Sequence, residues 1–167
     1  MQERGVMPEI TNHSGGCSCG EIRFGFRGDA EQQLACSCRT CQYTSGGGPN
    51  YSVIVDGENF RVTRGTPREF KTLSEAGHVL IRYFCGNCGT HIYATSERSP
   101  DSRSIKVGAL DDSSGFRPRV HFWTSEAPRW HKKHWFTMRF SKNPPQRGSQ
   151  AAPEREDIDP LNSDHPI

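Results

Sequence analysis

The sequence predicts an all-β domain built from antiparallel sheets, with few and short helices. Apolar and polar residues alternate in short runs along the middle of the chain, which is the two-residue period of a strand with one buried face. Gly, Pro, Asn and Asp separate these runs at short intervals, as the turns between consecutive strands require. No segment keeps the 3.6-residue apolar period of an amphipathic helix, so we expect helices to contribute little.

The alternation marks six strands and the limits of the folded domain. The predicted strands are Glu21–Phe26, Tyr51–Val55, Asn59–Thr63, Arg68–Lys71, His78–Phe84 and Ser104–Val107. They place the folded β domain at residues 16–140. Residues 1–15 are polar and irregular, and we expect a flexible N-terminal segment there. Residues 141–167 hold five prolines and almost no large apolar side chain, which predicts a disordered tail.

Composition limits the classes of function. The 167 residues carry a net charge of +2, which argues against a nucleic-acid partner. No run of about 18 apolar residues exists, so we expect no membrane span. The N-terminus lacks an apolar stretch of signal-peptide length, and this predicts a cytoplasmic protein. Hydrophobic residues make up only 32% of the chain, which favours a core assisted by metal.

Seven cysteines fall into three close groups. These are Cys17-x-Cys19, Cys36-x-Cys38-x-x-Cys41 and Cys85-x-x-Cys88. The odd number and the missing signal segment argue against a closed set of disulfides, whereas closely spaced thiolates are the ligands that zinc prefers. The alternatives are buried apolar cysteines without metal, a disulfide, or a redox dithiol formed by Cys85 and Cys88. No thioredoxin-like βαβ pattern surrounds that dithiol.

Two of the groups together make one complete zinc site. Cys85 and Cys88 supply half of a tetrahedron, and the glycines beside them allow the backbone to fold around a metal. Cys17 and Cys19 have the same glycine-rich surroundings and supply the other half. We therefore predict that these four residues, the four-cysteine cluster, hold a structural zinc ion that joins the first strand to a late one.

The remaining group, the three-cysteine cluster, leaves a metal with an open position. Cys36, Cys38 and Cys41 can wrap one zinc ion, and three protein ligands plus a water or substrate is the pattern of catalytic zinc. Zinc with an open position can take a substrate thiol and hold it as a thiolate at neutral pH. The alternatives are a closed site completed by a histidine, and three free thiols that sense oxidants.

The cysteine groups resemble those of a known family. The carriers of the resemblance are the run 16–24 (GCSCGEIRF), the triplet Cys36-x-Cys38-x-x-Cys41, the run 84–90 (FCGNCGT), the run 108–112 (GALDD) and the region Pro118–His121. The sequence resembles the glutathione-dependent formaldehyde-activating enzyme family, which includes centromere protein V-like proteins. The match covers about residues 16–135 and agrees with the family in the order and spacing of all three cysteine groups.

The resemblance implies a fold, two zinc ions and a reaction. The fold is a β-tent of packed antiparallel sheets pinned by a structural zinc. The implied structural ligands are Cys17, Cys19, Cys85 and Cys88, and the implied catalytic ligands are Cys36, Cys38 and Cys41. The implied activity is that of a carbon–sulfur lyase that joins glutathione and formaldehyde reversibly into S-hydroxymethylglutathione. Many members have a histidine where this chain has Ser37. The alternative function is a non-catalytic, zinc-stabilised module that binds a protein or nucleic acid.

Several other polar residues allow both a functional and a structural interpretation. His91 and His121 are candidate proton carriers, although a histidine in a β-rich core is more often structural. Asp111 and Asp112 follow a strand, and we expect their carboxylates to cap backbone amides in a turn. Arg39 lies inside the cysteine triplet, where it either meets a substrate carboxylate or faces solvent.

Two irregular segments lie outside the predicted strands. Residues 129–135 (RWHKKHW) interleave cations with aromatic residues, and we expect an edge element with its tryptophans packed on the core rather than a nucleic-acid site. Residues 46–49 (GGGP) lack the Lys-Ser/Thr of a phosphate loop, and we expect a flexible lip beside the three-cysteine cluster.

Overall fold

The fold comes from a computed structural model that describes residues 12–28, 30, 32–74, 76–131 and 137–143. The described residues form eleven strands: β1 (Asn12–Gly16), β2 (Arg23–Arg27), β3 (Gln32–Cys36), β4 (Asn50–Asp56), β5 (Phe60–Arg64), β6 (Arg68–Leu73), β7 (Val79–Phe84), β8 (His91–Ser96), β9 (Ser99–Lys106), β10 (Val120–Phe122) and β11 (Met138–Arg139). One short α-helix, α1 (Arg39–Tyr43), and three single-turn 3₁₀ helices accompany them: η1 (Gly57–Asn59), η2 (Val107–Ala109) and η3 (Thr124–Glu126).

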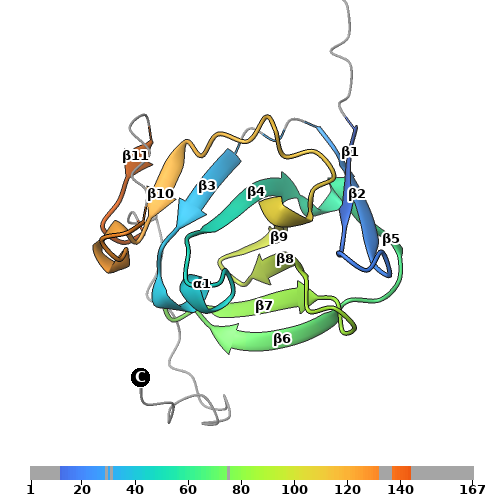
Figure 1. The fold of residues 1–167 in the computed structure, drawn as a ribbon, viewed down its shortest axis with the longest axis horizontal. Coiled ribbons are helices and arrows are strands. Elements are labelled where there is room, and N and C mark those ends of the chain that lie inside the picture. Colours follow the sequence, from blue (N-terminus) through green and yellow to red (C-terminus); the bar gives the residue numbers. More distant parts are fainter. Residues whose placement is uncertain (1–11, 29, 31, 75, 132–136, 144–167) are drawn as a thin grey trace, which may run out of the picture.

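The strands form two sheets, which confirms the predicted all-β fold with few short helices. The small sheet has the order β1-β2-β5, and the large one has the order β11-β10-β3-β4-β9-β8-β7-β6 (Figure 1). Nearly every pair is antiparallel, as predicted, because short turns join consecutive strands. The exception is β10, which runs parallel to both β3 and β11 at one edge of the large sheet.

A core of apolar side chains from both sheets holds them together. Phe24 of β2 and Phe60 of β5 lie with ring centroids 5.6 Å apart, and Val53 and Ile105 of the large sheet are buried in the same cluster. Burial of such a side chain stabilises the fold by about 1.5–3 kcal/mol. Cys17 and Cys85 belong to this core as well, so one cysteine cluster lies at the junction of the sheets.

The opposite face of the large sheet carries polar residues, and the strand register shows that they share it. Directly paired residues point to the same face, and so do residues two apart on one strand. Cys36 pairs with Asn50, Ser52 with Lys106, and Ala94 with both Ser104 and Arg82. The resulting set spans five strands, β3, β4, β9, β8 and β7. We call its polar members the polar row: Cys36, Asn50, Ser52, Lys106, Ser104 and Arg82.

The six predicted strands correspond to β2, β4, β5, β6, β7 and β9, and the other five were not predicted. β1 begins at Asn12, inside the segment 1–15 that we expected to be flexible, because its Ser-Gly-Gly backbone pairs with β2. Residues 1–11 and the tail beyond 143 lie outside the described residues, so the predicted domain division stays a prediction there. Within the described residues, no helix has the length and apolar character to cross a membrane.

The expected packing of the tryptophans in 129–135 is wrong for Trp130. Its side chain is 68% exposed, because the polypeptide turns at Pro128 and buries His131 instead. Trp135 lies outside the described residues.

Candidate metal centres

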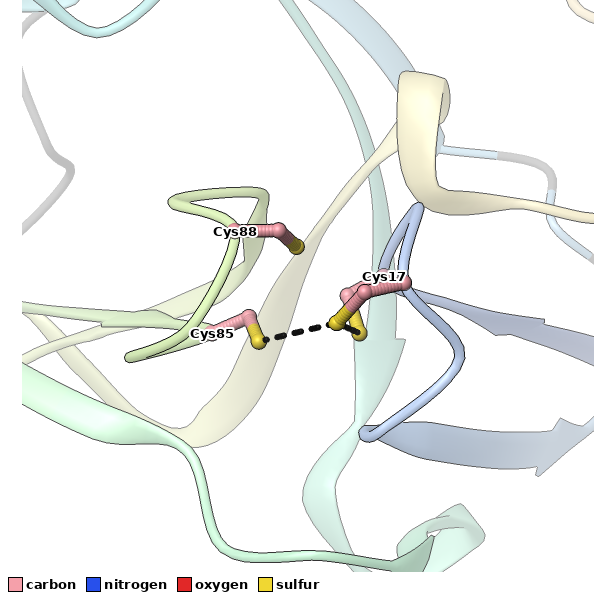
Figure 2. A group of neighbouring side chains, drawn as sticks. Cys17, Cys85 and Cys88 are labelled. Atoms are coloured by element: carbon pink, nitrogen blue, oxygen red, sulfur yellow. Dashed lines mark hydrogen bonds between the residues drawn. The ribbon is translucent and has the colours of Figure 1, made fainter.

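The four cysteines predicted to hold a structural zinc come together from two turns. Cys17 and Cys19 lie between β1 and β2, and Cys85 and Cys88 lie between β7 and β8 (Figure 2). All four sulfur atoms lie within 4.8 Å of one another. Cys17 and Cys85 are buried, whereas Cys19 and Cys88 are exposed. The cluster therefore ties the small sheet to the large sheet from the solvent edge of the core.

Each of the two turns closes through a glycine. Gly20 and Gly89 both have φ of +74°, a conformation that strains any residue with a Cβ. Gly20 N–H donates to the Cys17 carbonyl at 3.0 Å, and Gly89 N–H donates to the Cys85 carbonyl at 2.9 Å. The turns therefore have the same local form, and each brings its cysteines to one side.

Hydrogen bonds directed at the sulfurs favour the thiolate state. The amide of Ile22 donates to Cys17 Sγ at 3.1 Å, and Thr90 Oγ1 lies 3.2 Å from Cys88 Sγ. Side-chain hydrogen bonds from Ser18 and Thr90 lower the pKa of Cys88 to about 4. The thiolate is the form that binds metal, so the local structure prepares this residue as a ligand.

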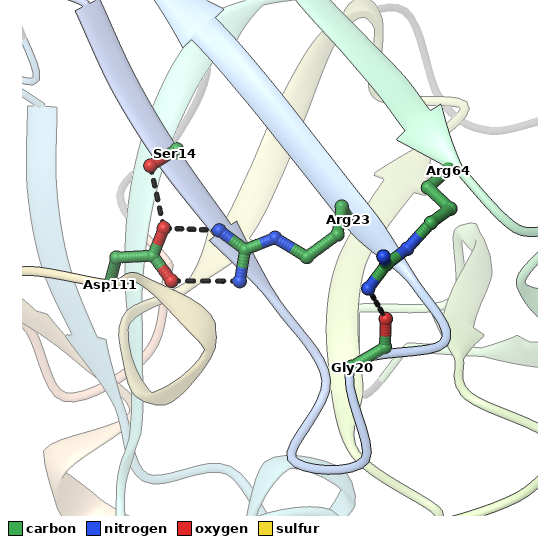
Figure 3. Close-up of polar contacts among 5 residues, drawn as sticks. All are labelled: Ser14, Gly20, Arg23, Arg64 and Asp111. Atoms are coloured by element: carbon green, nitrogen blue, oxygen red, sulfur yellow. Dashed lines mark hydrogen bonds and ion pairs between the residues drawn. The ribbon is translucent and has the colours of Figure 1, made fainter.

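Polar contacts brace the β1–β2 turn (Figure 3). Asp111 accepts hydrogen bonds from Arg23 Nη1 at 2.9 Å and from Ser14 Oγ at 2.6 Å, and Arg64 donates to the Gly20 carbonyl. The hydrogen bond from Arg23 holds the pKa of Asp111 below its ordinary value. The expected capping role fits Asp112, whose carboxylate accepts the Ser114 amide at 2.8 Å, whereas Asp111 forms an ion pair.

The other three cysteines converge where β3 ends and α1 begins. The sulfurs of Cys36, Cys38 and Cys41 lie within 4.8 Å of one another, and no fourth His, Cys, Asp or Glu of the described chain joins the group. Cys38 is the N-cap of α1, and the amides of Cys41 and Gln42 donate to its carbonyl at 3.0 and 3.1 Å. The helical turn thus places Cys41 beside the two cysteines that precede it.

Two cations of the polar row face the three-cysteine cluster. Arg82 is 3% exposed and close enough to hydrogen-bond the sulfur of Cys41. Lys106 is partly buried and donates to Asn50 Oδ1, and Asn50 Nδ2 donates to Ser52 Oγ at 2.7 Å. Burial lowers the pKa of Lys106 to about 8, while negative charge at Cys41 acts in the opposite direction.

The pKa values of the three thiols are shifted in different directions. Hydrogen bonds from Cys36 and Cys38 lower the pKa of Cys41, and the charges of Lys106 and Arg82 add to this effect. The pKa of Cys36 is raised by hydrogen bonding to Cys38 and Cys41 and by burial. Cys41 is therefore a thiol of the cluster whose negative charge both cations favour.

A buried hydrogen-bond chain links the cluster to the glycine-rich segment 46–48. Ser37 Oγ lies 2.7 Å from His121 Nε2 and 3.2 Å from His131 Nδ1, and His131 Nε2 donates to the Gly47 carbonyl at 2.8 Å. A carbonyl only accepts, so in the neutral ring of His131 the Nδ1 atom accepts from the Ser37 hydroxyl. Ser37 in turn accepts from His121, which gives this histidine a structural partner.

α1 is fixed by Gln42 and by contacts to the η3 segment. Gln42 Nε2 donates to the carbonyls of Ser37 at 2.7 Å and Glu126 at 3.1 Å, and the Arg39 amide donates to Glu126 Oε2 at 2.9 Å. The Arg39 guanidinium lies over the exposed Tyr43 ring, 4.4 Å from its centroid. Arg39 is exposed to solvent at the start of α1, next to Cys38 in the sequence.

His91, the other candidate proton carrier, has an unusual atom. Its Nδ1 is buried and is the one such side-chain atom in the described part of the chain without a hydrogen-bond partner. Burial lowers its pKa, and the charges of Lys106 and Arg82 lower it further, so the ring is neutral.

Sequence reasoning missed Arg82, Lys106 and Asn50 altogether. Arg82 interrupts the apolar strand β7, which is a signal in the sequence, whereas the shared face of Arg82, Lys106 and Asn50 follows only from the register of neighbouring strands.

Both clusters fit zinc by the chemistry of their donor atoms. Four sulfurs from two glycine turns match a closed tetrahedral site, and three sulfurs with no fourth partner match an open one. Cysteine sulfur excludes hard cations such as Mg²⁺ and Ca²⁺, which prefer oxygen. The two clusters can therefore hold metal ions, and their ligand number separates the roles they can play.

Comparison with known proteins agrees with this chemistry. A sequence model described as glutathione-dependent formaldehyde-activating enzyme matches residues 12–126, which include all seven cysteines. The chain belongs to this family. A crystal structure of a Rhodobacter sphaeroides protein shares the fold, with a TM-score of 0.50 and 19% identity over 64% of this chain and 92% of that chain.

Proposed function

We propose that this protein is a zinc enzyme of the carbon–sulfur lyase type that adds glutathione reversibly to formaldehyde or to a similar small aldehyde. The observation that carries the proposal is the three-cysteine cluster, in which Cys36, Cys38 and Cys41 meet without a fourth ligand among the described residues. The proposal assigns the catalytic zinc to this cluster. It assigns the structural zinc to Cys17, Cys19, Cys85 and Cys88, which gives two zinc ions per chain.

The residues around the three-cysteine cluster divide the work of the site. Zinc bound there would supply a Lewis acid that lowers the pKa of a thiol and holds the sulfur near its partner. Arg82 and Lys106 offset the negative charge of the cysteines from the sheet side. Arg39, exposed at the start of α1, offers a guanidinium to a carboxylate of glutathione. The adduct forms when the thiol loses its proton and its sulfur bonds to the aldehyde carbon, whose oxygen becomes the hydroxyl.

The proposal assigns no proton transfer to His121. Its Nε2 atom is hydrogen-bonded to Ser37 in the buried hydrogen-bond chain, and the residue is 3% exposed.

A cytoplasmic location is part of the proposal because the seven cysteines must stay reduced to bind metal.

The test combines metal content with product formation. Zinc per chain is measured for the wild type, Cys38→Ser and Cys17→Ser, and S-hydroxymethylglutathione is followed by NMR with glutathione and formaldehyde. We expect Cys38→Ser to lose one zinc and all acceleration while staying folded. Wild-type protein that holds two zinc ions but leaves the uncatalysed rate unchanged would refute the lyase activity.

A second candidate is a zinc-stabilised binding module. Its support is an exposed aromatic surface: Tyr43 is 61% exposed and Trp130 is 68% exposed, and Trp130 lies near Gly47 of the glycine-rich segment. In that case Cys38→Ser would leave function intact, whereas Trp130→Ala would abolish capture of the partner. If the protein is a lyase, Cys38→Ser instead abolishes its function.

A further inference from the structure

Two cations of the polar row, Arg82 and Lys106, lie on the large sheet without a carboxylate of the described chain to balance them. Among the described residues the ion pairs are Arg23–Asp111 and His78–Glu97, and neither Arg82 nor Lys106 takes part in one. Arg82 is buried on β7, and Lys106 is partly buried at the end of β9. A buried charge without a partner is strongly destabilising, so the structure must supply the compensating negative charge elsewhere.

The compensating charge comes from the cysteines. Negative charge on Cys36, Cys38 and Cys41 favours the charged form of both cations, whereas the charge of Arg82 disfavours that of Lys106. The register places Arg82, Lys106 and Cys36 on one face of the sheet, as members of the polar row. The guanidinium of Arg82 keeps its charge under all ordinary conditions, and Lys106 is anchored by its hydrogen bond to Asn50.

Counting charges distinguishes the possible occupants of the open position. Three thiolates and one divalent zinc ion carry one net negative charge, whereas Arg82 and Lys106 together carry two positive charges. With a neutral fourth ligand such as water, one positive charge stays unbalanced. With an anionic fourth ligand the group of metal, cysteines and two cations is neutral. Cys38 is buried and Cys36 and Cys41 are partly buried, and at such a site a difference in net charge affects ligand binding more than it does in water.

We propose that Arg82 and Lys106 are specificity-determining residues that make the three-cysteine metal site select an anionic fourth ligand, a thiolate in the reaction, over a neutral one. The inference rests on the metal site of the proposed function and extends it to the sheet beneath. Arg82 contributes the larger share because its guanidinium keeps its charge at every ordinary pH and its side chain is the less exposed of the two.

The experiment measures ligand affinity at the metal by spectroscopy and needs no turnover. Full-length protein is loaded with Co²⁺, whose visible absorption reports its ligands, and a cobalt-loaded Cys38→Ser sample is subtracted to remove the signal of the four-cysteine cluster. Azide and glutathione serve as anionic probes, and imidazole, at a pH where it is neutral, serves as the uncharged probe. The variants are Arg82→Met, Arg82→Lys and Lys106→Met, with Lys71→Met, an exposed cation on the adjacent strand β6, as the matched control.

In Arg82→Met and Lys106→Met we expect the affinity for azide and glutathione to fall about tenfold or more while the affinity for imidazole stays within about twofold. Arg82→Lys retains most of the anion affinity, and Lys71→Met matches the wild type. Circular dichroism and cobalt content verify that each variant is folded and loaded. Lys106→Met provides an independent test if Arg82→Met does not fold.

Two results would overturn the inference. One is a change in azide and imidazole affinity by the same factor in the variants, or no change in either. The other is a wild-type site that takes no metal or whose spectrum responds to none of the three probes. Wild-type protein that binds azide in an Arg82-dependent manner but ignores glutathione would support the charge rule and refute glutathione as the substrate. The failure of the inference and the failure of the proposed function are therefore distinguishable.

Discussion

Gly89 is required by the backbone rather than by packing. Its φ is +74°, yet a Cβ added there would meet no atom within 4 Å. Gly108 offers the same open space without a positive φ. Alanine substitutions at Gly89 and Gly108 therefore differ in backbone strain and not in crowding.

We expect Gly89→Ala to destabilise the protein by about 1–2 kcal/mol and to speed the loss of one zinc to a chelator, because a left-handed conformation strains alanine and the turn carries Cys85 and Cys88. Gly108→Ala should change neither property by a measurable amount. Urea unfolding and zinc release give both quantities. Equal behaviour of the two variants would show that the positive φ at Gly89 does not matter for the site.

Ser37 occupies the centre of a buried polar chain and has no exposed surface. Ser37→Ala leaves polar atoms of His121 and His131 without this partner, and we expect a loss of about 1–3 kcal/mol in the free energy of unfolding. Ser113→Ala, at an exposed position, is the control and should stay within about 0.5 kcal/mol of the wild type. A Ser37→Ala protein as stable as the control would show that this hydrogen-bond chain does not stabilise the fold.

The pH dependence of one ion pair follows from the lowered pKa of Asp111. A carboxyl whose folded-state pKa is depressed adds stability above its unfolded pKa, and that stability disappears as the pH falls through the folded value. We therefore expect Asp111→Asn to be less stable than the wild type near neutral pH and to match it in acid. Asp101→Asn, at an exposed carboxyl, controls for zinc release in acid. A difference in stability between Asp111→Asn and the wild type that stays constant from neutral to acidic pH would contradict a stabilising role for the Asp111 carboxylate.

Short elements position the two clusters in different ways. The four-cysteine cluster joins the β1–β2 turn of the small sheet to the β7–β8 turn of the large sheet. The three-cysteine cluster arises within one local stretch, from the end of β3 into α1. Loss of the first removes one link between two sheets that the apolar core also joins, whereas loss of the second disturbs one loop and one helical turn.

This difference predicts unequal effects of matched substitutions. Cys88→Ser should lower the free energy of unfolding by about 4 kcal/mol or more, because it removes a ligand of the site that holds the sheets together. Cys41→Ser should cost clearly less and leave the fold intact. Thermal unfolding of the zinc-loaded variants compares them directly. If Cys41→Ser is the more destabilising variant, the structural and catalytic assignments must be exchanged.

Across the whole molecule, local sequence patterns predicted what depends on near neighbours along the chain. The grouping of the cysteines and strands such as Tyr51–Val55 follow from spacing and alternation. The polar row does not, because Arg82 and Lys106 lie far apart in sequence and share a face only through the pairing of β7, β8 and β9. The parallel strand β10 and the exposure of Trp130 likewise depend on the path of long loops.

The most direct test of the account is the sulfur coordination of zinc, measured by X-ray absorption with and without glutathione. The account predicts two zinc ions that share seven cysteine sulfurs, so that the mean number of sulfur neighbours per zinc rises when glutathione fills the open position. It also predicts that Arg82→Met blunts this rise. Sulfur coordination that is already complete without glutathione, or that does not change when it is added, would contradict an open, thiol-binding metal site.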